Sequence, residues 1–293
     1  MLERIDHIVA VVPDLAAAAA AYERLGLVLT PETRHAETGA ANRACFIGSG
    51  PENYAYIELL AVVDEARARA SGRGHYVEAA ARGGGLVSIV FGVSDITASS
   101  AGLRERGLAA PVETIHRDDG SKVCDVAQVA TPPEVPFRVA LIQYPESWQA
   151  RYERSVAAGR FAHTLPLKRL DHLAAVAPDL DAGTAFWSGI MGVPVVGELN
   201  TPAMTIRQLK IGDAMFELLG PSGPDSPFAG RPASLASMAA WEVSGRLDTA
   251  VETVTARDFT CPAAEAGVIP GTRRSSIPAG ELVGLGMQLL EYV

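Results

Sequence analysis

Two histidines of this 293-residue chain stand in matching apolar runs. His7 lies in RIDHIVAVVPDL, and His172 lies 165 residues later in RLDHLAAVAPDL; the four differences between these runs exchange one apolar residue for another. Side chains alternate between the two faces of a strand, so His7 shares a face with Ile5 and Val9. An imidazole in such surroundings is a candidate metal ligand or proton carrier.

Three glutamates also lie within apolar runs typical of strands: Glu58 in YIELLAV, Glu217 in FELLG and Glu291 in QLLEY. Burying a carboxylate is unfavourable unless it is paired, protonated or bound to a metal, so three such residues are poorly explained as solvated surface. Histidine with carboxylates is a borderline-to-hard donor set, which suits Zn²⁺, Mn²⁺, Co²⁺, Ni²⁺ or Fe²⁺ better than copper. The alternative for each residue alone is a structural role, in which it faces water or satisfies a neighbour.

The elements that carry these residues repeat four times along the chain. Each copy, here called a module, reads as one strand, one helix and three further strands, and the modules begin at about residues 4, 86, 169 and 237. Pro-Asp marks the helix start in the first and third modules, and Gly26 and Gly192 mark the helix ends. One helix per four strands indicates an α+β fold with antiparallel pairing.

We expect two domains, residues 1–150 with the first and second modules and residues 166–293 with the third and fourth. Residues 151–165 are expected to form a helical linker. Neighbouring elements usually pack together, which favours this sequential pairing. The alternative pairs the first module with the third, and it would bring into one site His7, Glu58, His172 and Glu217.

The chain resembles the vicinal-oxygen-chelate superfamily of glyoxalases, bleomycin-resistance proteins and extradiol dioxygenases. The first half resembles glyoxalase-like domains through RIDHIVAVVPDL, TGAANRACFIG and YAYIELLAV, and residues 169–229 resemble methylmalonyl-CoA epimerases. The resemblance implies two tandem domains with cupped sheets of mixed and antiparallel strands. This fold supports isomerases, lyases, dioxygenases and plain binding proteins, so the resemblance indicates the fold more sharply than the activity.

The superfamily holds its metal ion with one residue from the first strand and one from the last strand of each module. The resemblance therefore implies the pairs His7 and Glu58 in the first module and His172 and Glu217 in the third. In the second module the matching residues are Ser88 and Gln143, and in the fourth they are Ala239 and Glu291, so both of these modules lack the second histidine. The ligands expected are Glu58, Gln143 and His7 in the first domain, and Glu217, Glu291 and His172 in the second.

Candidate catalytic and substrate-binding residues follow from the same pattern. Glu217, Glu291 and Glu58 are the carboxylates expected to move a substrate proton. Substrate contacts are expected from Asn42, Arg43 and Tyr56, with Arg43 as an anchor for an anionic group. The position of the epimerase base corresponds to Thr201, and the nearest carboxylate, Glu198, lies three residues away.

These residues favour a metal-dependent lyase, isomerase or epimerase, which acts through an enolate on a small substrate with carbonyl or hydroxyl oxygens. A non-catalytic, drug-sequestering binding protein, which needs no metal, is the alternative that the missing histidines favour. An extradiol dioxygenase ranks lower, because that chemistry needs two histidines and one carboxylate and Ala239 stands where the second histidine belongs.

Composition narrows the function classes. The net charge is −9, with 34 acidic and 25 scattered basic residues, which argues against nucleic acid and anionic membranes as partners. We expect neither a signal peptide nor a membrane span. The three cysteines are few and widely spaced, which favours a reducing cytoplasm, and the abundance of Ala and Gly resembles a bacterial protein. A small-molecule substrate is the expected partner, and a homodimer is left open.

Overall fold

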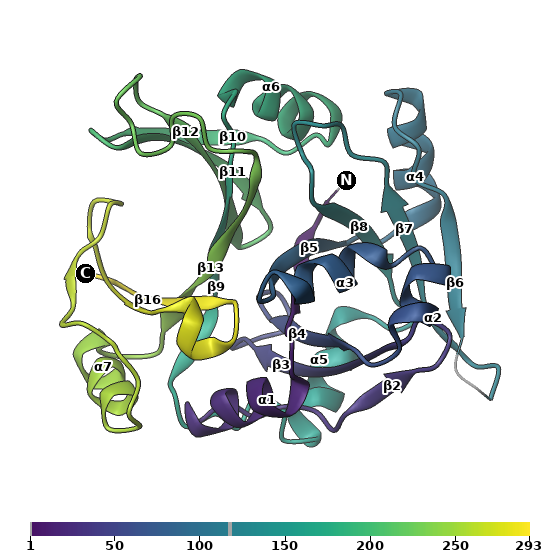
Figure 1. Cartoon of the computed structure of the whole chain (residues 1–293), viewed down its shortest axis with the longest axis horizontal. Coiled ribbons are helices and arrows are strands. Elements are labelled where there is room, and N and C mark those ends of the chain that lie inside the picture. The colour runs from purple at the N-terminus through teal and green to yellow at the C-terminus, as the bar shows by residue number, and fades with distance from the viewer. Residues whose placement is uncertain (1, 117–118) are drawn as a thin grey trace. The chain divides into compact units, whose positions relative to one another are not determined.

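The computed structural model describes residues 2–116 and 119–293 and contains the four expected modules (Figure 1). The first module consists of β1 (Arg4–Val11), α1 (Leu15–Arg24), β2 (Thr33–His35), β3 (Ala40–Ile47) and β4 (Ala55–Val62). The second consists of β5 (Gly85–Gly92), α4 (Ile96–Glu105), β6 (Val112–His116), β7 (Lys122–Val129) and β8 (Arg138–Gln143). Two helices that the sequence did not predict join these modules, α2 (Glu65–Ala70) and α3 (Gly74–Ala81).

The second half of the chain follows α5 (Trp148–Ala157), which overlaps the helical linker expected at residues 151–165. The third module consists of β9 (Leu167–Val176), α6 (Leu180–Thr184), a π-helix η1 (Ala185–Ile190), β10 (Val195–Asn200), β11 (Met204–Ile211) and β12 (Ala214–Pro221). The fourth consists of β13 (Ser234–Val243), α7 (Leu247–Thr255), β14 (Glu265–Ala266), β15 (Thr272–Ile277), a 3₁₀-helix η2 (Ala279–Leu282) and β16 (Gly286–Tyr292).

The strands form two eight-stranded sheets, in the orders β2-β3-β4-β1-β5-β8-β7-β6 and β10-β11-β12-β9-β13-β16-β15-β14. Each sheet takes its strands from two consecutive modules, so the predicted sequential pairing is confirmed. Within every module the first strand runs parallel to the last, and the other neighbours are antiparallel. The α+β fold class with mixed sheets is confirmed. The intervening helix and strands provide the long crossover that a parallel pair requires.

The helix boundaries follow from local side-chain and backbone chemistry. Asp14, Asp95 and Asp179 cap the N-termini of α1, α4 and α6 by accepting a hydrogen bond from the backbone N–H three residues later. Gly26 and Gly192, the predicted helix ends, have φ angles of 91° and 74°. This left-handed region is open to glycine at little steric cost, so both residues end their helices as expected.

Contacts group the chain into two compact units, each of which combines modules from both sheets. One unit (residues 1–6, 88–151 and 172–236) holds the second and third modules, and within it Trp187 packs against the rings of Phe91 and Phe137. The other unit (residues 7–87, 152–171 and 237–293) holds the first and fourth modules. The expected domain boundaries, at residues 150 and 166, stay a prediction; β8 ends at Gln143 and β9 begins at Leu167.

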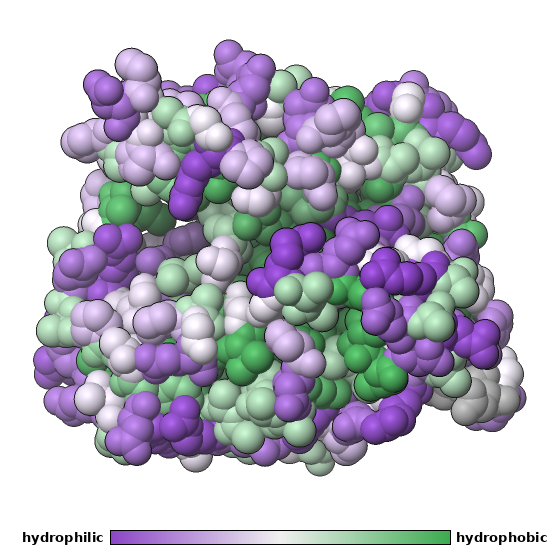
Figure 2. Space-filling view, viewed as in Figure 1, coloured by the Kyte–Doolittle hydropathy of each residue, from purple (hydrophilic) through white to green (hydrophobic). Residues whose placement is uncertain are grey.

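Hydrophilic side chains are spread among apolar ones on the face drawn in Figure 2, consistent with the scattered charges of the sequence. Across residues 2–116 and 119–293, the helices are too short or too polar to cross a bilayer. All three cysteines are free thiols: Cys45 and Cys124 are buried, and Cys261 is half-buried. Burial raises the pKa of the Cys124 thiol to about 11.

Candidate metal and substrate site

The first and last strands of a module bring a histidine and a glutamate together. In the parallel pair β1 and β4, Glu58 is the register partner of Val9, which lies two residues after His7 on the same face. The third module repeats this register in β9 and β12 for His172 and Glu217. The sheet pairing therefore directs both side chains of each pair to one face, one pleat apart.

The two pairs have nearly the same geometry. His7 Nε2 lies 3.7 Å from Glu58 Oε2, and His172 Nε2 lies 3.9 Å from Glu217 Oε2. The predicted proximity within both pairs is confirmed. These distances are longer than a hydrogen bond, whereas two ligand atoms that each lie about 2.0–2.2 Å from one ion are about 3–4 Å apart.

All four side chains are largely removed from water. The exposed fractions are 7% for His7, 16% for Glu58, 15% for His172 and 6% for Glu217. A carboxylate at this depth needs a cation, a proton or hydrogen-bond donors. The donor atoms, their spacing and their burial therefore fit two ligands of a divalent ion in each half.

Each glutamate also accepts a hydrogen bond from a side-chain amide. Asn42 Nδ2 donates to Glu58 Oε1, and Gln208 Nε2 donates to Glu217 Oε1 at 2.9 Å. Asn42, an expected substrate contact, thus directs its amide nitrogen to a candidate ligand, and its role toward substrate stays a prediction. Gln208 was missed, although its place on the strand antiparallel to FELLG could have indicated it.

A row of stacked rings continues from His7 across the sheet. Tyr56, the register partner of His7 and an expected substrate contact, stacks on the imidazole with ring centroids 4.4 Å apart, and Phe46 stacks on Tyr56 at 4.7 Å. In the third module the corresponding positions hold Met215 and Lys210. The first half thus presents an aromatic wall beside its histidine. In the second, Met215 lies beside His172, and Lys210 Nζ donates to the carbonyl of Asp213 at 3.1 Å.

Arg43 lies outside this group, because adjacent residues of a strand point to opposite faces. Its Nη2 donates to Glu23 Oε1 at 2.7 Å, and its Nε donates to the carbonyl of Thr30 at 2.7 Å. The structure thus uses the guanidinium to tie β3 to α1 and to the segment that follows it. Arg43 and Asn42, which were expected to act together, face different parts of the fold.

The second module offers no comparable pair at the matching positions. Ser88 is the register partner of Arg138, so the residue that corresponds to Glu58 is Ala140. Gln143 lies three residues further along β8, and its Oε1 accepts the backbone N–H of Ile96 at 2.8 Å. The structure therefore directs the Gln143 amide oxygen to the start of α4.

In the fourth module the expected carboxylate has a cationic partner. Ala239 pairs in register with Met287, which places Leu289 where the third module has Glu217. Glu291, two residues further along the same face of β16, lies 3.2 Å from Arg273 Nη1. Arg273 also pairs with Asp248, and these contacts raise the pKa of its guanidinium.

Within the described ranges 2–116 and 119–293, groups of three or more His, Cys, Asp or Glu side chains placed to share one ion are absent. The donor set that each half displays is therefore one histidine and one glutamate, with an amide bound to the glutamate. The further ligands that an ion would need are not among these residues.

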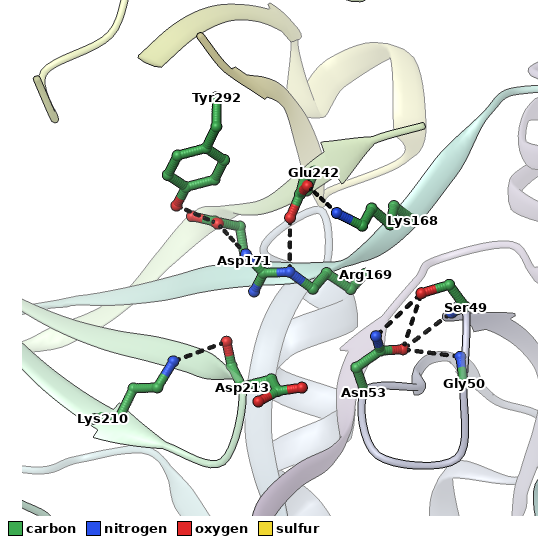
Figure 3. Close-up of polar contacts among 10 residues, drawn as sticks. All are labelled: Ser49, Gly50, Asn53, Lys168, Arg169, Asp171, Lys210, Asp213, Glu242 and Tyr292. Atoms are coloured by element: carbon green, nitrogen blue, oxygen red, sulfur yellow. Dashed lines mark hydrogen bonds and ion pairs between the residues drawn. The ribbon is translucent and has the colours of Figure 1, made fainter. Parts of the chain in front are cut away.

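The Asp residue before each histidine was not predicted to have a role, although Arg-x-Asp-His occurs in both repeats. The Tyr292 hydroxyl donates to Asp171 Oδ2 at 2.7 Å, and Asp171 also contacts Arg169, which donates to Glu242 (Figure 3). The first half repeats part of this arrangement, with a 3.0 Å hydrogen bond from Tyr144 to Asp6. Each bond joins a module's first strand to the end of the next module, at Tyr292 in β16 and at Tyr144 directly after β8.

The position expected for an epimerase base, Thr201, carries a hydroxyl in place of a carboxylate or imidazole. The Thr201 hydroxyl donates to the carbonyl of Met204 within a turn. Glu198 forms an ion pair with Arg207, and this hydrogen bonding holds the pKa of the Glu198 carboxyl below its usual range. An ionised, paired carboxylate on the edge strand β10 is a poor proton shuttle near neutral pH.

Comparison with known proteins agrees with this arrangement of modules. The family model of the glyoxalase-like domain matches residues 5–164, and that of the glyoxalase/bleomycin resistance protein/dioxygenase superfamily matches residues 169–263. Methylmalonyl-CoA epimerase of Homo sapiens is 38% identical over 66 residues, which make up 22% of this chain and 38% of the human protein. The chain thus matches little more than a third of that relative's length.

Two solved structures share the fold over the whole chain. A hypothetical protein from Staphylococcus aureus has a TM-score of 0.66 at 14% identity, with 99% of each chain covered. The Mn(II)-bound glyoxalase from Novosphingobium aromaticivorans has a TM-score of 0.62 at 12% identity, with 100% of this chain and 84% of that one covered. Such identities show the fold alone, whereas the family models cover most of the sequence. The chain therefore belongs to the glyoxalase-like domain family and carries two tandem domains of the vicinal-oxygen-chelate type.

Proposed function

We propose that this protein is a metal-dependent isomerase, epimerase or lyase that acts through an enolate on a small substrate with neighbouring oxygen donors. The observation that carries the proposal is the pair of His–Glu arrangements, with nitrogen–oxygen separations of 3.7 and 3.9 Å and little exposure to water. Relatives named methylmalonyl-CoA epimerase, and a related fold solved with Mn(II), are consistent with it.

The proposed roles follow from the contacts of each residue. His7 with Glu58, and His172 with Glu217, would bind a divalent ion, which supplies Lewis-acid polarisation of a substrate carbonyl when bound. Either glutamate would accept a proton from carbon through its Oε2, which lies toward its histidine while its Oε1 is held by an amide. Gln143 and Glu291 are left out of this proposed set, because Ile96 and Arg273 engage them.

Metal binding is the first test. The purified protein, freed of metal with a chelator, is titrated with Co²⁺, and the visible spectrum reports on ligand type and geometry. We expect binding that is lost in the double variant His7→Ala/His172→Ala and kept in His35→Ala, a histidine in the exposed strand β2. Each single variant shows which half binds the ion. Absence of binding in the wild-type protein would refute the proposal.

The second test is proton exchange. Enolate formation replaces the hydrogen next to a carbonyl by deuterium in D₂O, whichever of the three reaction types follows. We expect catalysed exchange for at least one 2-substituted acyl thioester or 2-hydroxy carbonyl compound, and loss of exchange in Glu58→Gln or Glu217→Gln. Metal binding without exchange in either compound class would contradict the enolate mechanism.

A binding protein without catalysis is the second candidate, and one observation favours it. Ser88 and Ala239 stand where a site of this superfamily would have its second histidine. Ligand binding that is unaffected by removal of metal, together with no exchange, would support this alternative. An extradiol dioxygenase stays less favoured, and formation of a ring-opened catechol product with Fe²⁺ would reverse that ranking.

A further inference from the structure

The two oxygens of each candidate glutamate face different partners. Oε2 of Glu58 lies toward His7, and its Oε1 accepts a hydrogen bond from Asn42. In the same way, Oε2 of Glu217 lies toward His172, and its Oε1 accepts a hydrogen bond from Gln208. An ionised carboxylate can only accept hydrogen bonds, so the amide must present its nitrogen. Each amide thereby fixes the rotation of the carboxylate about its last side-chain bond.

The amides occupy different positions in the two repeats. Gln208 is the direct register partner of Glu217. The direct partner of Glu58 is Ala44, and Asn42 reaches Glu58 from two residues further along the same face of β3. In the third module, Ile206 occupies the place that corresponds to Asn42. The two halves therefore make the same bond with different residues, which is unexpected if the amides serve only to fill space.

The choice of donor also separates these glutamates from two others in the chain. Glu198 and Glu291 pair with guanidinium groups, Arg207 and Arg273 respectively. A guanidinium neutralises a carboxylate, whereas an amide orients it and leaves its negative charge available. An amide is thus the donor suited to a carboxylate that must still bind a cation or take up a proton.

We propose that Asn42 and Gln208 are positioning residues, which hold Glu58 and Glu217 in the orientation that a divalent ion requires. This inference rests on the proposed function for the ion itself, and it adds the residues that prepare the site. Partners that orient metal ligands typically account for about 10–100-fold in metal affinity. The amides act through the glutamates and need not touch the ion or the substrate.

The first experiment is a Co²⁺ titration of the full-length protein with single variants. We expect Asn42→Ala and Gln208→Ala each to weaken binding in their own half by about 10–100-fold. The matched control is Asn200→Ala, which removes an amide that contacts the exposed Glu198. Affinities equal to wild type in both amide variants would overturn the proposal.

Relocation of the amide separates positioning from general stability. Ala44 stands where the other repeat has its glutamine and is only half-buried, so Asn42→Ala/Ala44→Gln rebuilds the donor at the position used in the third module. We expect this double variant to regain most of the affinity and the wild-type Co²⁺ spectrum. A folded double variant without recovery would count against positioning.

The positioning proposal has a readout that needs no metal. Crystal structures are determined for metal-free wild-type protein, Asn42→Ala and Gln208→Ala. They give the distance from the histidine Nε2 to the glutamate Oε2 in each pair, which is 3.7 Å for His7 and Glu58 and 3.9 Å for His172 and Glu217. We expect the freed carboxylate to turn away from its histidine in each variant. If the wild-type protein binds no metal, the proposed function fails, and these structures still decide positioning: unchanged separations would overturn it.

Discussion

Tyr56 stacks on His7 with an angle of 12° between the ring planes and 4.4 Å between the centroids. Their strands pair in parallel register, and the stack fixes the plane of the imidazole as well as its place on the sheet. Phe46 extends the stack at 4.7 Å, and the ring of Phe161, beyond the end of α5, meets Phe46 edge-on at 6.1 Å. A continuous set of aromatic contacts therefore leads from the linker to a candidate ligand.

The first prediction is that Tyr56→Ala lowers the free energy of unfolding by about 1–3 kcal/mol, because it removes two ring contacts and partly buried apolar area. Tyr56→Phe keeps the ring, so its free energy of unfolding should fall clearly less than that of Tyr56→Ala. Urea unfolding, followed by circular dichroism, measures both variants against wild type. Equal losses in the two variants would show that the stack contributes little.

The second prediction concerns His163, whose ring bridges two backbone groups. Val28 N–H donates to Nδ1 at 2.9 Å, and Nε2 lies 2.6 Å from the carbonyl of Phe46, so the neutral ring carries its proton on Nε2. Burial lowers the pKa of His163 below its usual value of 6.5. The unfolded chain therefore takes up a proton on this residue more readily than the folded protein does.

The consequence is a loss of stability in mild acid. The contribution of His163 is fully present above about pH 6.5 and declines as the pH falls toward the lowered pKa of the folded state. Unfolding free energies between pH 8 and pH 5 measure the slope, and His163→Gln should show a shallower decline than wild type. Parallel curves for the two proteins would contradict this account.

The third prediction separates two roles for Gln143. Its Oε1 accepts the N–H of Ile96 at the start of α4, so Gln143→Leu should lower stability by about 1 kcal/mol, as removal of a helix cap does. Gln143→Glu keeps an acceptor and serves as the control. Thermal unfolding and Co²⁺ titration are measured on both variants. A fall in Co²⁺ affinity at unchanged stability would instead assign Gln143 to the metal site.

The fourth prediction concerns the phenol–carboxylate bonds that follow from the Arg-x-Asp-His repeat. Asp171 is buried and accepts from Tyr292 at 2.7 Å, so Tyr292→Phe should destabilise the protein by about 1–3 kcal/mol, the range for a hydrogen bond to a charged group. Tyr144→Phe should act similarly on Asp6. Tyr152→Phe, on α5, is the comparison variant. Chemical denaturation that leaves both test variants within about 0.5 kcal/mol of wild type would refute the prediction.

The sequence predicts the architecture well because the same strand, helix and turn signals occur in both halves of the chain. Matching apolar runs, Asp caps and helix-ending glycines recur at one offset, and each is a short-range signal with a direct physical cause. The proximity of His7 to Glu58 and of His172 to Glu217 could be predicted for the same reason. Their proximity depends only on which strands pair and on the alternation of side chains.

Most of the contacts that were missed depend on register across different strands. Gln143 is the last residue of β8, yet β8 pairs with β5 so that Ala140 takes the place equivalent to Glu58. Arg43 and Asn42 are neighbours in sequence and opposite in direction, which alternation alone could have shown. The partner of Glu217 needed the exact β11–β12 register, which no local pattern of apolar residues specifies.

Among the residues that the structure describes, the strands at the edges of the two sheets are β2, β6, β10 and β14. Two of them are very short, with three residues in β2 and two in β14, and β10 carries an irregular register near Gly197. Short or bulged edges are poor templates for intermolecular pairing, which protects a chain with two large sheets from aggregation. The fourth edge, β6, also has an irregular register, between Ile115 and His116. Both of the longer edges expose apolar side chains, Val112 and Ile115 on β6 and Val195 and Val196 on β10. These two edges are consequently where a loss of solubility would begin, and Ile115→Lys and Val196→Lys are the substitutions that would strengthen their resistance to intermolecular pairing.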